Sequence, residues 1–100
     1  MNVQRIWVQN LVLDPRLGNN TATAEFNFAG EHVLVQVALC QVSTFASVSI
    51  TKFVDSNGGT RGIDEFLSFV ELEHATQVEV TLSADQGVVA AAVATAFIFD

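Results

Sequence analysis

The stretch HVLVQVALCQVSTFASVSITKFV, residues 32–54, decides the fold that this sequence predicts. It carries no charged residue between Val33 and Thr51, and its apolar side chains recur mainly at every second position. A period of two is typical of β-strands, whose successive side chains point to opposite faces of a sheet. Interspersed glutamine, serine and threonine residues argue against a membrane-spanning helix, which prefers about 20 predominantly apolar residues. We therefore predict that this central run is core β-structure.

The central run is too long for one strand, and its own pattern indicates where it divides. Its 23 residues would extend roughly 76 Å at about 3.3 Å per residue, several times the length of a normal strand. The strongest apolar residues stand at odd positions in 33–39 and at even positions in 46–54. A change of parity requires a turn or an added residue. We expect this break between Cys40 and Phe45.

Four other segments are predicted strands. Residues 21–28 and 76–83 alternate between apolar and polar side chains. Residues 3–13 are partly apolar on both faces, and residues 88–99 are uncharged on both faces. The alanines of the last segment would suit a helix, but its valines and its terminal Phe-Ile-Phe favour a strand. Its small side chains would allow close approach of another layer of structure.

Clusters of Gly, Asn, Asp and Pro separate these strands. Residues 14–20, DPRLGNN, form a predicted loop, and residues 55–62, DSNGGTRG, carry the strongest turn signal of the chain. We expect the Ala-Gly-Glu sequence at 29–31 to turn the chain into the central run as a hairpin. We expect a second hairpin at 84–87, ADQG.

Residues 63–73, IDEFLSFVELE, fit two kinds of secondary structure. Ile63, Phe66 and Val70 recur at helical spacing, and acidic residues at 64 and 65 would suit the first turn of a helix. The short length and the phenylalanines favour a strand. We predict a strand, with a short helical turn near 63–67.

Seven or eight short strands, with turns between them, predict an all-β fold. We expect one domain over residues 1–100, built as a single antiparallel β-sandwich with jelly-roll character.

Composition points to a partner. Half of the residues are apolar and 15% are charged, against roughly 25% charged in an average soluble domain. A domain of 100 residues cannot hide so many apolar side chains in one small core, so apolar surface should remain for a partner. The surplus is greatest at 88–99 and on the face of the first strand that carries Trp7. We expect a homo-oligomer or another protein partner.

Net charge and targeting signals narrow the function classes. The net charge of −7, with four scattered basic residues, argues against nucleic acid, whose phosphates need clustered Lys and Arg. The first ten residues show no basic region followed by a long apolar stretch, so we expect no signal peptide, no membrane insertion and a soluble cytoplasmic chain. Cys40 is the single cysteine, which excludes an intrachain disulfide.

Neither a metal nor a cofactor is predicted. The pairs Glu31-His32 and Glu73-His74 offer metal-binding side chains, but neighbours on a strand point to opposite faces. In the calcium-loop pattern, Asp55 and Asn57 could serve as ligands, yet Phe66 stands where the final Glu belongs. An ordinary hairpin or binding loop is favoured there.

No motif of catalysis stands out, so we do not expect an enzyme. The glycines at 58, 59 and 62 match no phosphate-binding pattern, and no GxSxG sequence occurs. Two functions remain as hypotheses. The first is a structural module in a homo-oligomeric assembly, such as a component of a virion or another large particle. The alternative is a small ligand-binding module, lectin-like or metal-binding, that uses loops 14–20 and 55–62.

Five residues are the candidate contacts for an interface or a ligand. Trp7, flanked on its face by Arg5 and Gln9, could stack on a sugar, anchor a protein interface or fill the core. The turn region supplies the remaining candidates. The full set is Arg5, Trp7, Asp55, Asn57 and Arg61.

Overall fold

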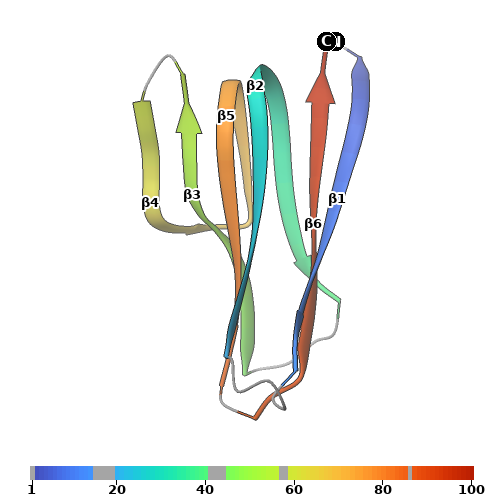
Figure 1. The fold of residues 1–100 in the computed structure, drawn as a ribbon, viewed down its shortest axis with the longest axis vertical. Coiled ribbons are helices and arrows are strands. Elements are labelled where there is room, and N and C mark those ends of the chain that lie inside the picture. Colours follow the sequence, from blue (N-terminus) through green and yellow to red (C-terminus); the bar gives the residue numbers. More distant parts are fainter. Residues whose placement is uncertain (1, 15–19, 41–44, 57–58, 86) are drawn as a thin grey trace.

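The described residues form one antiparallel sheet and no helix, which confirms the all-β prediction (Figure 1). The computed structural model describes residues 2–14, 20–40, 45–56, 59–85 and 87–100, with the backbone alone described at 59–66. The strands are β1 (Val3–Leu13), β2 (Thr21–Leu39), β3 (Ala46–Asp55), β4 (Gly59–Leu67), β5 (Phe69–Ala84) and β6 (Ala90–Phe99). Their order in the sheet is β1-β6-β2-β5-β3-β4.

The break predicted in the central run is confirmed. β2 ends at Leu39 and β3 begins at Ala46, so the two halves of the run belong to different strands. They are not neighbours, because β5 lies between them in the sheet.

The hairpin predicted at 29–31 is wrong, because β2 continues through these residues. Gly30 adopts a positive φ of 85°, and the pairing register with β5 shifts between Asn27 and Val33. From Asn27 to Val33 the chain advances six residues on β2 but five on β5, from Gln77 to Leu72. The added residue makes a bulge that bends the strand without ending it.

This bulge also changes which positions of β2 face the core. Before it the buried residues are at even positions, Ala24 and Phe26; after it they are at odd positions, Val33 and Val35. Without the bulge, one half of the strand would present its apolar side chains to water. Gly suits this position because a positive φ carries little steric cost without a Cβ atom.

The count of seven or eight strands is not reached in the described part of the chain, where six strands form. The segments 21–28 and 32–39 merge into β2. The segment 63–73 is divided at Ser68: its first part belongs to β4, and its last part joins 76–83 in β5. The helical turn expected near 63–67 is wrong, because the backbone is a strand there.

The two predicted turns that follow β3 and β5 differ in outcome. β3 and β4 form the hairpin expected at 55–62, with Asp55 paired to Gly59, so the turn is shorter than predicted. The hairpin expected at 84–87 is wrong, because β2 lies between β5 and β6 in the sheet. Gly87, with φ 87°, lies in a turn closed by a hydrogen bond from Val88 N to Asp85 O of 3.1 Å. The chain crosses there to the other side of β2.

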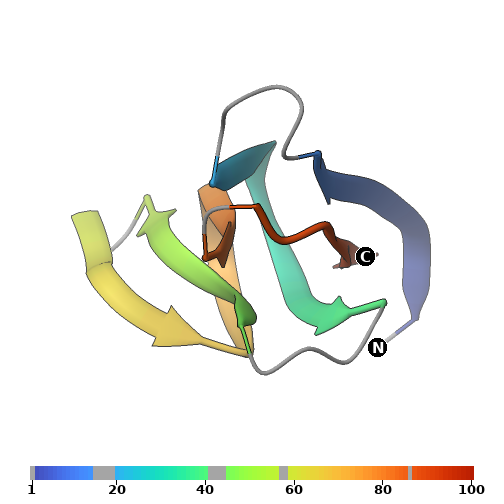
Figure 2. The ribbon, with the colours of Figure 1, turned by 90° about the horizontal axis from the view of Figure 1, so that it is seen from below.

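The sheet curves strongly, so that β1 comes to lie against the first half of β2 (Figure 2). The concave side holds the core, to which every strand with described side chains contributes. From β6 the core receives mainly alanine, at positions 90, 92, 94 and 96, and these short side chains leave room for the larger residues opposite. The largest fully buried side chains are Phe26, Val33, Val35, Ile50, Val78, Val80, Leu82 and Ile98.

In the described part of the chain, no helix has the length and apolar character needed to cross a membrane.

Candidate functional site

The candidate site is the convex outer side of β1, β6, the second half of β2 and the start of β5. Along these strands, alternate side chains point away from the core because their neighbours fill it. Most of the outward side chains are apolar, and we call this surface the apolar face. Its apolar members are Ile6, Val8, Val12, Leu34, Ala38, Phe69, Ala91, Val93, Phe97 and Phe99.

The strand register aligns these side chains in rows across the sheet. Ile6 of β1 lies opposite Phe97 of β6, which lies opposite Leu34 of β2. Two residues further along, Val8 lies opposite Thr95, and the same row continues to β2. Side chains in one row are separated by about 4.8 Å, the spacing of neighbouring strands. The first row is therefore apolar across three strands, whereas the second carries the polar side chains of Thr95 and Gln36 beyond Val8.

The apolar side chains of β1 are open to solvent to an unusual degree. Ile6 is 58% exposed, Val8 52% and Val12 63%, and Phe69 on β5 is 63% exposed. β1 is the edge strand of the sheet, so no further strand shields these residues. Scattered exposed apolar residues are normal, but a line of exposed apolar side chains along one side of an edge strand indicates an interaction surface.

A hollow lies on the same face. β6 stands between it and the exposed side chains of β1. Its volume is about 610 Å³, and it lies where β5 leaves β2 at Ser68. Phe69 and Val93 stand on its walls, and Gln36 and Thr95 supply polar atoms. The hollow is also lined by Leu34, Val37, Ala38 and Glu71.

Charge on the apolar face is confined to one end. His32 and Glu71 form a pair there, with His32 Nε2 2.7 Å from Glu71 Oε2. The His32 ring also contacts the ring of Phe99, with centroids 5.0 Å apart. The imidazole thus joins the charged end of the face to its aromatic part.

The outer face of the other half of the sheet has a different chemistry. There Thr23 of β2 lies opposite Thr81 of β5, which lies opposite Ser49 of β3. The hydroxyl oxygens of Thr51 and Thr81 are 2.9 Å apart, at hydrogen-bond distance. This hydroxyl-bearing surface, with Glu79 beside it, suits contact with water. The two outer faces of one sheet therefore differ sharply in polarity.

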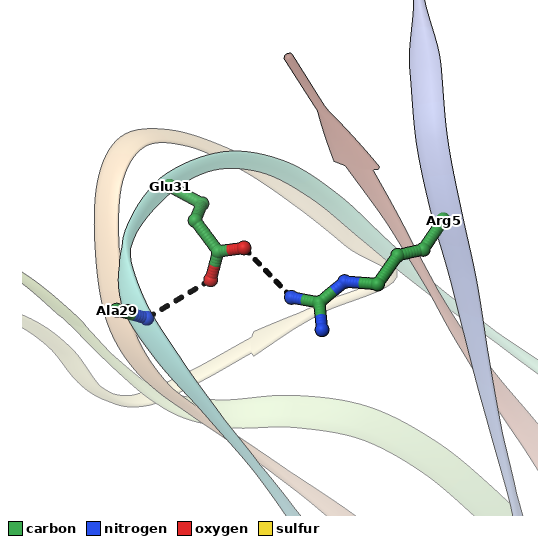
Figure 3. Close-up of polar contacts among 3 residues, drawn as sticks. All are labelled: Arg5, Ala29 and Glu31. Carbon is green, nitrogen blue, oxygen red and sulfur yellow. Dashed lines mark hydrogen bonds and ion pairs between the residues drawn. The ribbon is translucent and has the colours of Figure 1, made fainter.

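Arg5, a predicted contact, is held by a carboxylate of the β2 bulge (Figure 3). Its Nη2 donates to Glu31 Oε2 at 2.7 Å, and Glu31 Oε1 accepts a hydrogen bond from Ala29 N at 2.9 Å. One carboxylate therefore binds both the bulge and β1. Gln9 adds a second tie, since its Nε2 donates to Glu25 O at 2.8 Å.

Trp7 points into the concave side, where it meets aromatic residues of β2. Its ring stands edge-on to Phe26, with centroids 4.9 Å apart, and edge-on to Phe28 at 6.0 Å. Leu11 and Leu13, on the same side of β1, are buried. The face of β1 that carries Trp7 thus packs on the core, and the exposed apolar stripe is the opposite one.

The remaining predicted contacts lie at the far edge of the sheet from β1. Asp55 ends β3, and its Oδ2 accepts a hydrogen bond from His74 N at 3.2 Å. Asn57 lies outside the described residues, and Arg61 is placed in β4 by its backbone. Because β1 and β4 are the two edges of the sheet, the structure does not bring Asp55 together with Trp7 and Arg5.

Within the described ranges, no group of three or more His, Cys, Asp or Glu side chains is placed to hold a metal ion. The two Glu-His pairs are separated as expected for neighbours on a strand. Glu31 contacts Arg5, whereas His32 contacts Glu71.

No model of a known protein family matches the chain, and no curated protein matches it.

Sequence reasoning placed part of the surplus apolar surface correctly, at 88–99, but placed the rest on the wrong face of β1. The even positions of β1, at Ile6, Val8 and Val12, could have been compared with the odd positions, where Trp7, Leu11 and Leu13 lie. Both faces are apolar, and the face with the larger side chains is the one that packs on the core. In the central run, Leu34 and Ala38 alternate with the core residues of β2, so the sequence marks this half of β2 as apolar on both faces; Phe69 of β5 carried no separate signal.

Proposed function

We propose that this domain is a non-enzymatic structural module that assembles with copies of itself through the apolar face. Such a module would suit a virion or another large particle. The single observation that carries the proposal is the exposure of the outward apolar side chains of β1, where Ile6, Val8 and Val12 are each more than half open to water. They border a face on which the row from Ile6 through Phe97 to Leu34 is apolar across three strands. Water contact with this area is unfavourable, and burial against a second apolar surface removes it.

The distribution of polar groups supports burial of this particular face. On the described part of this face, the acidic side chain is Glu71, paired with His32 at one end, so little charge would lose its hydration in an interface. The hydroxyl-rich outer face of β2, β5 and β3 stays in contact with water in such an assembly. The jelly-roll arrangement of the strands remains part of this proposal, supported by the bends that let β2 and β5 each serve both halves of the sheet.

Sedimentation velocity over a range of concentrations tests the proposal. We expect the unmodified chain to associate at micromolar concentration and Ile6→Glu to remain monomeric, because the new carboxylate would be buried without a partner. Thr23→Glu is the matched control, since it makes the same charge change at an exposed strand position of the hydroxyl-rich face. A monomer at all concentrations, or equal effects of both variants, would refute the proposal.

A second candidate function is the binding of a small ligand, and the hollow favours it. Its volume of about 610 Å³ falls within the range of ligand pockets, and its walls combine apolar side chains with Gln36 and Thr95. A thermal-shift screen of glycans, metal ions and small amphipathic compounds tests this candidate. A melting temperature that rises with ligand concentration supports it, and no rise across the panel counts against it.

A further inference from the structure

We infer that the hollow binds an elongated amphipathic amine, with its ammonium group beside Glu71 and its apolar end between Ala38 and Val93. This inference rests on the second candidate function, ligand binding in the hollow, and adds the chemical class of the ligand. It follows from the order in which the strand register places acidic, polar and apolar side chains along the hollow.

The hollow exists because β2 loses one of its two neighbours part-way along its length. Gln36 is the last residue of β2 with a partner in the described part of β5, where it lies opposite Phe69. Two residues further along, Ala38 still lies opposite Val93 of β6. The short side chain of Ala38 on the floor and the ring of Phe69 on the wall therefore leave a recess.

Three rows of side chains cross the hollow, and they differ in chemistry. In order along β2 they are Leu34 with Glu71, then Gln36 with Thr95 and Phe69, then Ala38 with Val93. From the first row to the third, β2 advances four residues, or about 13 Å at about 3.3 Å per residue. A ligand that fills the hollow is therefore elongated, with a carboxylate beside one end and apolar side chains around the other.

Glu71 determines the chemistry of the polar end of the ligand. Among the residues that line the hollow it is the ionisable one, and 60% of its side chain is exposed. Its contact with His32 Nε2, at 2.7 Å, uses Oε2 and leaves Oε1 for a second donor. An ammonium group is a matching donor for a carboxylate. An acidic ligand would instead meet like charge, both at Glu71 and over a chain of net charge −7.

The rest of the hollow suits an alkyl chain or an aromatic ring. Phe69, which is 63% exposed, supplies an aromatic wall, and Val93 stands on the opposite side. A sugar carries hydroxyl groups along its whole length, so some of them would lie against Ala38 and Val93 without a hydrogen-bond partner. A metal ion would meet a single carboxylate where it needs several ligands. An alkyl or aryl-alkyl amine matches both ends of the hollow.

An NMR titration with three small probes tests the ligand class. 4-Phenylbutylamine, 4-phenyl-1-butanol and 4-phenylbutyrate share a phenyl-alkyl body and differ in charge. We would titrate them at pH 8, where free imidazole is largely neutral. The amine should shift the backbone amide signals of Ala38, Val93 and Thr95. It should bind at least about threefold more tightly than the alcohol, which is the effect of one partly exposed ion pair, and the butyrate should bind more weakly than both.

Variants of two acidic residues assign the preference to Glu71. Glu71→Gln should bring the affinity for the amine down to that for the alcohol, whose own affinity should stay unchanged. Glu73→Gln is the matched control, because it makes the same charge change at an exposed position of β5 outside the hollow, and it should keep the preference. Ala38→Trp should abolish the binding of both probes, because the larger ring fills the floor of the hollow.

The outcomes separate the ligand class from ligand binding itself. Equal affinities for the amine and the alcohol, tighter binding of the butyrate, or a preference that survives Glu71→Gln would overturn the inference and leave ligand binding in the hollow intact. Signals that no probe shifts at 10 mM would refute the second candidate function and this inference together. Binding that Ala38→Trp leaves unchanged would also refute both, because the probes would then bind elsewhere.

Discussion

Phe26 offers a direct test of how β1 is held against β2. Its side chain is fully buried on the concave side, and its ring meets Trp7 edge-on at 4.9 Å and Phe28 in a stacked pair at 6.0 Å. Replacing it by alanine removes the centre of this aromatic group. The cavity that remains lies between two strands that are not hydrogen-bonded to each other through their backbones.

The expected loss of stability can be estimated from this geometry. Truncation of a fully buried phenylalanine to alanine costs about 3–5 kcal/mol, which includes the cavity left behind. Loss of the edge-on contact with Trp7 places the value in the upper half of this range, at about 4–5 kcal/mol. A domain of this size has a total free energy of unfolding of about 5–15 kcal/mol, so Phe26→Ala should be barely stable. Phe26→Leu keeps most of the volume and should cost about 1–2 kcal/mol.

Urea unfolding at a concentration where the chain is monomeric measures these values. Phe69→Ala is the matched control, because its ring is 63% exposed on the apolar face and its removal should change the monomer by less than about 0.5 kcal/mol. Trp7 is the only tryptophan, and its native fluorescence should shift to the red in Phe26→Ala but not in Phe69→Ala. Equal losses for the two variants, or a loss below 1 kcal/mol for Phe26→Ala, would refute the packing described above.

Substitutions at four further positions test the bends and the core. Gly30→Ala should lower the free energy of unfolding, measured in urea, by about 1–2 kcal/mol. The cause is the positive φ alone, because no atom lies within 4 Å of an added Cβ. Gly30→Asn should lower it by less, because Asn adopts a positive φ more readily than Ala. Ala94→Leu should lower stability by about 1–3 kcal/mol through overpacking of a fully buried position, and an unchanged melting temperature would contradict the assigned core. Glu31→Ala should destabilise the chain more than Arg5→Ala, because Glu31 also accepts a hydrogen bond from Ala29 N. Arg5→Ala should lower the stability by less than about 1 kcal/mol, and this effect should shrink in 0.5 M salt. The reverse order of the two losses would count against the role of Glu31 in the bulge.

The position of the candidate site was only partly predictable from the sequence. Low charge and high apolar content indicated surface beyond the needs of the core, and the uncharged residues of β6 were recognised as part of it. The apolar face combines residues of four strands, however, and its rows depend on which strands become neighbours. β6 is hydrogen-bonded to β1 and β2, which precede it by more than 50 residues, and no local pattern specifies that pairing.

The sequence by itself determined that the chain is all-β and that the central run divides between Cys40 and Phe45, because alternation of apolar residues is a local property of each strand. Only the tertiary structure decided whether Gly30 turns the chain or bends one strand. A glycine with positive φ serves a hairpin or a bulge equally well, and the pairing of β5 with residues on both sides of Gly30 selects the bulge. The same holds for β1, whose two faces are both apolar. The side that packs against Phe26 became core, and the other side became the apolar face.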